Sequence, residues 1–86
     1  MSLKRKHQKT LQLIFNRPVS GSVKWPDIES LFTTLGAEIE ERAGSRVGVT
    51  LFGVIRVFHR PHPTNDTDKG AVNSIRCWFE ENGVRP

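Results

Sequence analysis

Apolar and polar residues alternate along positions 37–58, AEIEERAGSRVGVTLFGVIRVF. A period of two is typical of strands that bury one face, and turn-forming residues at 43–45 and at Gly53 divide this run into three segments. Because neither connection is long enough for a crossover helix, we predict an antiparallel sheet of three consecutive strands. The third strand, residues 54–58, is followed by two prolines, which cannot continue a hydrogen-bonded ladder.

Helical periodicity precedes and follows this predicted sheet. We predict a first helix over residues 4–16 and a second from Pro26 to Gly36, because proline suits a first turn and glycine suits a C-terminal end. A third helix opens at residues 68–70 and closes at Gly83. The helical side chains that we expect in the core are Leu11, Ile14, Phe15, Trp25, Ile28, Leu31, Phe32, Leu35, Val72, Ile75, Trp78 and Phe79.

The resulting order is helix-helix-strand-strand-strand-helix (α-α-β-β-β-α). It predicts an α+β fold in which a three-stranded antiparallel sheet packs on helices. With 86 residues, of which 36% are hydrophobic, the chain can form one modest core, so we expect a single domain over residues 1–86. Residues 1–24 are its additional N-terminal part, a basic helix and a loop.

The net charge of +4 is unevenly distributed along the chain. Residues 1–24 carry six cations and no acid, residues 25–45 are acidic, and residues 46–62 are basic again. Two basic segments suit a polyanionic ligand such as nucleic acid, although charged helix faces that contact only solvent would give the same composition. His7 lies in the first basic segment, and we expect it at the surface.

The single cysteine, Cys77, cannot form an internal disulfide. This favours a reducing cytoplasm, and we expect a buried, unreactive thiol. No apolar run approaches the roughly 18 residues that a membrane span needs, and the first residues are too polar for a signal peptide. We therefore predict a cytoplasmic protein with no membrane partner.

Residues 57–63, VFHRPHP, place two of the three histidines three positions apart, with Arg60 between them. Metal-independent RNA cleavage needs a base for the ribose 2′-OH, an acid for the leaving 5′-oxygen and a cation for the charged transition state. His59 and His62 are the available base and acid, and strand alternation puts His59 on the face of Val57. Two solvated loop histidines are the alternative. The pair is at most half of a metal site, because structural zinc takes four ligands, so we predict no metal and no cofactor.

A series of short motifs accompanies these elements. They are residues 35–37 (LGA) before the first strand, Gly44-Ser45 at a hairpin tip, residues 60–63 (RPHP) after the third strand, residues 69–75 (KGAVNSI) and Asn82-Gly83. In this order they resemble the HicA toxin family of bacterial toxin–antitoxin modules. The resemblance covers a little over half of the chain.

The resemblance implies a fold similar to double-stranded RNA-binding domains and a small ribonuclease that cleaves messenger RNA. It also implies a HicB-type antitoxin as the protein partner, while the oligomeric state stays open. The family's hairpin usually reads Gly-Ser-His, and that histidine is its expected catalytic residue, whereas this chain has Arg46 at the position. A second interpretation therefore stays open, a non-catalytic module that binds RNA or the antitoxin.

Four residues are predicted to contact RNA phosphates. Arg46 stays protonated and makes a poor base, but its planar guanidinium can hold a phosphate through paired N–H groups. Arg60 carries the same group. Lys69 opens the last helix, where unpaired backbone N–H groups favour anions. Ser45 precedes Arg46 at the hairpin tip. An exposed hairpin arginine and an ordinary capped helix start are the simpler interpretations of Arg46 and Lys69.

Overall fold

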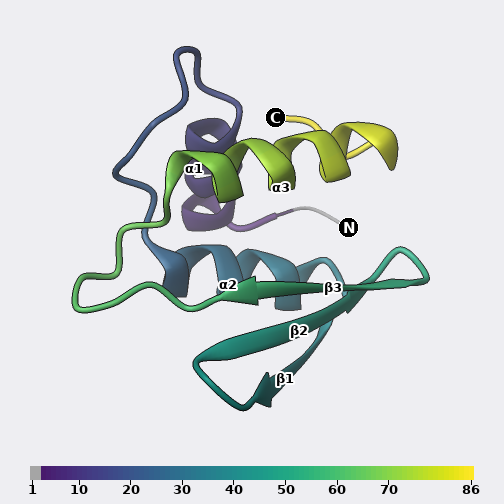
Figure 1. Cartoon of the computed structure of the whole chain (residues 1–86). Helices are drawn as coiled ribbons and strands as arrows, with labels where there is room; N and C mark the ends of the chain where they lie inside the picture. Colours follow the sequence, from purple (N-terminus) through teal and green to yellow (C-terminus); the bar gives the residue numbers. More distant parts are fainter. Residues whose placement is uncertain (1–2) are drawn as a thin grey trace.

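Three helices and three strands form in the order expected from the sequence, which confirms the α+β prediction (Figure 1). The computed structural model describes residues 3–86. The elements are α1 (Arg5–Ile14), α2 (Trp25–Thr34), β1 (Glu38–Arg42), β2 (Arg46–Leu51), β3 (Val54–His59) and α3 (Lys69–Glu81). The strands pair antiparallel in the order β1-β2-β3, as their short connections require.

The two faces of the sheet have different surroundings. Val47 and Val49 of β2 are fully buried, whereas Ile55 and Val57 of β3 are 59% and 46% exposed. Val57 pairs with Gly48, the residue between the two buried valines, so the two pairs lie on opposite faces. Figure 1 shows all three helices on one side of the sheet. We call this side the helix face and the uncovered side the open face.

The helix ends follow the predicted capping residues. Gly36 and Gly83 have φ angles of 100° and 77°, which glycine adopts without a Cβ clash, and they end α2 and α3 as predicted. Asp68 precedes α3, and its carboxylate accepts a hydrogen bond from the backbone N–H of Ala71 at 2.9 Å. This cap fixes where α3 begins, directly after the loop that carries His62.

An aromatic cluster between the helices and the sheet forms the centre of the core. The ring of Phe32 lies 5.9 to 6.2 Å, centroid to centroid, from those of Trp25, Phe58, Trp78 and Phe79. Of the helical side chains expected in the core, Phe15 and Leu35 are only partly buried, because both lie at the ends of their helices. The buried core residues are Leu11, Ile14, Val23, Trp25, Ile28, Leu31, Phe32, Val47, Val49, Leu51, Phe58, Val72, Ile75, Trp78 and Phe79.

The loop after β3 is tied to the connection between α1 and α2. The backbone N–H of Trp25 donates to the carbonyl of Asn65, and the N–H of Thr67 donates to the carbonyl of Val23, each at 2.8 Å. These two bonds hold the end of the N-terminal segment beside the start of α3.

The prediction that His7 lies at the surface is wrong. His7 is only 4% exposed, and its Nε2 lies 2.9 Å from Oγ of Ser30 on α2. Its position explains the burial, because His7, Leu11 and Ile14 are spaced by three or four residues and share the side of α1 that packs on the other helices.

The prediction that Cys77 is buried is also wrong. Cys77 is exposed, although the neighbouring Trp78 is fully buried. The reason is helical geometry, because Val72, Ile75 and Phe79 form the buried stripe of α3 and the side chain of Cys77 lies outside that stripe.

Candidate functional site

The tip of the β1–β2 hairpin and the end of β3 lie side by side. The backbone N–H of Arg60 donates to the carbonyl of Ser45 at 2.8 Å. Arg46, the first residue of β2, is the direct cross-strand partner of His59, the last residue of β3. Both side chains are exposed and share the open face, with Cβ atoms roughly 5 Å apart as in any such pair. The structure therefore brings Ser45, Arg46 and His59 together.

His59 and His62 line one hollow of about 240 Å³ between the end of β3 and the start of α3. The other residues around it are Pro61, Thr64, Asp66, Thr67, Asp68 and Ala71. Both carboxylates have a partner, because Asp66 forms an ion pair with Lys24 at 2.6 Å and Asp68 caps α3. The hollow is smaller than the roughly 300 Å³ at which drug-sized ligand sites begin. It can therefore hold a small ligand or one group of a larger one.

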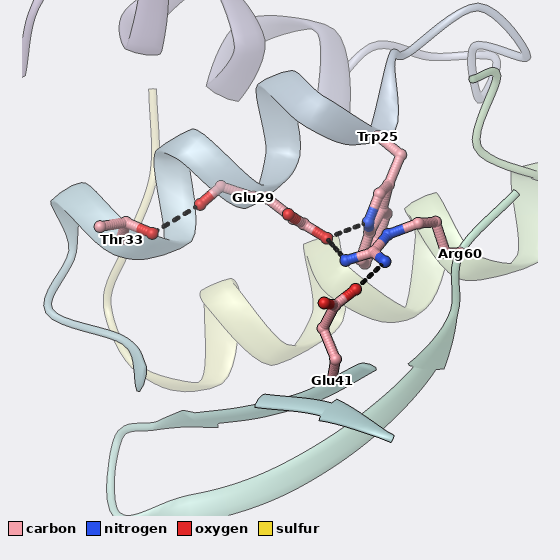
Figure 2. Close-up of polar contacts among 5 residues, drawn as sticks. All are labelled: Trp25, Glu29, Thr33, Glu41 and Arg60. Atoms are coloured by element: carbon pink, nitrogen blue, oxygen red, sulfur yellow. Dashed lines mark hydrogen bonds and ion pairs between the residues drawn. The ribbon is translucent and has the colours of Figure 1, made fainter. Parts of the chain in front are cut away.

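Arg60 points to the opposite side of the sheet from His59, as the alternation of side chains requires. Its Nη2 donates to Glu29 of α2 at 3.1 Å, and its Nη1 donates to Glu41 of β1. Figure 2 shows the guanidinium between the two carboxylates, with the indole Nε1–H of Trp25 donating to the same oxygen of Glu29. The Glu29 backbone carbonyl also accepts a hydrogen bond from Thr33 on the next turn. We call Arg60, Glu29 and Glu41 the Arg60 clamp.

The clamp holds the loop after β3 in place. Hydrogen bonds from Arg60 to Glu41, and then to Glu29, raise the pKa of the guanidinium above its ordinary value. Arg60 therefore stays protonated and joins β1, α2 and the first residue after β3. His59 directly precedes Arg60 in the chain, and His62 follows it after Pro61.

Lys69 is exposed at the first position of α3, but its side chain does not line the hollow. It runs toward the connection between α1 and α2, where a Cβ placed on Gly21 would lie 3.2 Å from its Cε. Its neighbours Asp68 and Ala71 do line the hollow. Lys69 therefore lies at the rim of the candidate site, apart from the two histidines.

The sequence did not reveal the partners of Arg60. Glu29 and Glu41 lie 31 and 19 residues away along the chain, so no local spacing connects them to it. Thr67, which lines the hollow, is buried, and its hydroxyl has no hydrogen-bond partner among the described residues. Within residues 3–86, no group of three or more His, Cys, Asp or Glu side chains could hold a metal ion.

Residues 25–84 match the family described as HicA toxin of bacterial toxin-antitoxin. The chain belongs to the HicA toxin family. No match was found among curated proteins or among solved structures.

Membership of the HicA family supports a role as the toxin of a toxin–antitoxin module. The matched range begins at α2, so α1 and the connection after it precede the part that resembles other HicA toxins. In the part of the HicA chain that the structure describes, no helix is long and apolar enough to cross a membrane.

Proposed function

We propose that this HicA toxin is a metal-independent endoribonuclease that cleaves messenger RNA, with His62 and His59 as its acid and base. The observation that carries the proposal is the position of His59 at the end of β3, opposite Arg46 and beside the hollow that His62 also lines. Arg46 and His59 form a cross-strand pair, and His59 shares the hollow with His62. Cleavage of a phosphodiester next to a ribose needs a base, an acid and a cation, which two imidazoles and an arginine can supply.

In the proposed reaction, one imidazole takes the proton of a ribose 2′-OH and the 2′-oxygen bonds to phosphorus. The bond from phosphorus to the 5′-oxygen then breaks, and the other imidazole protonates that oxygen. The products are a 2′,3′-cyclic phosphate and a 5′-hydroxyl. Arg46 faces the charge that develops on the phosphate, while Ser45 and Lys69 contact neighbouring phosphates at the rim.

Arg60 was predicted to contact phosphate, but two carboxylates engage its guanidinium. This geometry supports a positioning role, in which Arg60 orients the segment that holds His59 and His62. The remaining elements of the proposal follow from family membership, which supports a HicB-type antitoxin as the partner and cytoplasmic messenger RNA as the substrate.

Alanine variants at the two histidines test the proposed chemistry. We expect His59→Ala and His62→Ala each to slow cleavage of a defined single-stranded RNA by about 10²-fold to 10⁴-fold, since each removes one general acid or base. RNA affinity should stay nearly constant, because neither imidazole supplies the main phosphate contacts. The matched control is Gln12→Ala, a change at an exposed residue of α1. Cleavage that survives both histidine variants would contradict the assignment.

A non-catalytic HicA module is the second candidate function. Arg46, where the family usually has its hairpin histidine, is the observation that favours it. This candidate requires that the unmodified protein binds RNA or the antitoxin and releases no cyclic phosphate. Analysis of the reaction products by mass spectrometry distinguishes the two functions.

A further inference from the structure

The cations of the chain fall into two groups that differ in their surroundings. Six of its 13 lysines and arginines have a carboxylate within 4.0 Å, namely Lys24, Arg42, Arg56, Arg60, Arg76 and Arg85. The other cations form no ion pair with any residue between 3 and 86, and they are Lys4, Arg5, Lys6, Lys9, Arg17, Arg46 and Lys69. Arg46 and Lys69 belong to the candidate site, so the remaining unpaired cations lie in the N-terminal segment.

Four of these cations lie at the N-terminal end of α1, where Lys4 is the N-cap residue. We call Lys4, Arg5, Lys6 and Lys9 the α1 basic face, and all four are exposed. The opposite side of α1 packs through His7, so the basic face is held in a fixed position relative to the rest of the molecule. It is also outside the matched HicA range.

The basic face is unfavourable for the helix that carries it. The first turn of α1 contains no acidic residue, and no side chain caps its N-terminus. Cations there oppose the positive end of the helix dipole, and the helix would gain stability from acids at the same positions. A local cost without a structural benefit is typical of residues retained for binding.

The chemistry of the α1 basic face suits RNA better than a protein. Protein interfaces need an apolar centre, and the large apolar side chains that are exposed in the described part of the chain lie on β3: Val54, Ile55 and Val57. Non-specific contacts with nucleic acid need only cations directed at phosphates. We propose that the α1 basic face is a second RNA-contacting surface, separate from the cleavage site. The proposal rests on RNA being the ligand of the proposed function.

The salt dependence of RNA binding tests this surface. The experiment uses the full chain with His59→Ala and His62→Ala, which leaves the RNA intact, and a labelled single-stranded RNA of mixed sequence. Adding Arg5→Gln and Lys9→Gln should weaken binding several-fold at low salt. The decline of log K with log salt concentration should also become less steep, by up to about 1.4 in slope. Each lost contact with a phosphate of single-stranded RNA reduces the steepness by about 0.7. Glutamine keeps the helix propensity of the replaced residues, and circular dichroism verifies the helix content.

The matched control exchanges the same two cations, Arg5→Lys and Lys9→Arg. Because both positive charges remain, the salt dependence of RNA binding should be the same as before the exchange. An unchanged slope in the glutamine variant would overturn the proposal, as would loss of antitoxin binding with RNA affinity unchanged. If the parent protein with both histidines intact neither binds nor cleaves RNA, the proposed function itself fails, and the second surface fails with it.

Discussion

Arg60 shows at the level of one residue how a cation can belong to a site without being available to its ligand. Its side chain is 37% exposed, yet Glu29 and Glu41 engage both of its terminal nitrogens. Because its pKa is raised, the guanidinium stays protonated throughout the neutral range and there makes its full contribution to the clamp. The contribution of the Arg60 titration is lost as the pH rises through the raised pKa, so it does not vary near neutral pH.

Substitution of Arg60 distinguishes positioning from phosphate binding. We expect Arg60→Lys to lower kcat with little change in KM, because lysine keeps the charge but lacks the fork that joins two carboxylates. The free energy of unfolding should fall by only about 0.5 to 1 kcal/mol, since the side chains of Arg60 and Glu41 are 37% and 74% exposed and solvent screens their ion pair. Steady-state kinetics and chemical denaturation measure the two quantities.

Glu29→Gln provides the control for this substitution. It removes a carboxylate from the clamp but keeps an oxygen that can accept from Trp25. If Arg60 positions the loop, Glu29→Gln should also lower kcat. Tighter RNA binding in Glu29→Gln would instead show that the carboxylate competes with phosphate for Arg60.

Residues whose environment is set by distant partners could not be predicted from local patterns. The partners of Arg60 come from another helix and another strand, so nothing near Arg60 in the sequence indicates them. His7 is a different case, because its spacing from Leu11 and Ile14 did carry the information. The charged residues beside His7 obscured this spacing of three or four residues, which places its side chain in the protein interior.

At the scale of elements, the cap of α3 links stability to the candidate site. Asp68 is the N-cap of α3 and also lines the hollow beside His62. A change at this residue therefore alters both the start of the helix and the charge near the proposed reaction.

Two substitutions of Asp68 separate these effects. Asp68→Ala should lower the free energy of unfolding by about 1 kcal/mol, because the backbone N–H of Ala71 loses its acceptor. Asp68→Asn should change the free energy of unfolding little, since asparagine caps a helix equally well. It should also tighten RNA binding, because it removes a negative charge beside the proposed site. Urea denaturation and RNA titration measure the two effects. Equal destabilisation in both variants would mean that the charge of Asp68, and not its cap, supports α3.

The elements themselves were predictable because each has its own signal in the sequence. Capping residues and apolar stripes located α2 and α3, and alternation located the three strands. The placement of His59 on the face of Val57 followed from the same alternation. The hollow was not predictable, because it forms where the end of β3 meets the start of a helix whose orientation depends on the whole core.

At the scale of the whole molecule, stability depends on few residues because the core is small. Phe32 contacts four other aromatic rings that come from α2, β3 and α3. Loss of this side chain leaves a cavity where both layers of the fold meet.

Phe32→Ala should therefore remove a large part of the total stability. We expect a cost of about 3 to 5 kcal/mol, against a total of about 4 to 13 kcal/mol for a domain of this length. Phe32→Leu should cost roughly 1 to 2 kcal/mol, and Val57→Ala on the open face should cost almost nothing. Thermal and urea unfolding provide the comparison. A similar loss in Val57→Ala would show that the open face is covered in solution.

The cross-strand pair of Arg46 and His59 has a consequence for how HicA sequences are compared. Two residues that face each other across an antiparallel ladder can exchange identities while both side chains stay within one side-chain length of their former places. A lineage could thus lose the histidine of the hairpin and keep an imidazole at the same spot, provided that one had already arisen on the neighbouring strand. Relatives sorted by the hairpin position alone would then be classed as lacking an imidazole, although one lies on the neighbouring strand. HicA sequences should therefore be compared at positions 46 and 59 together.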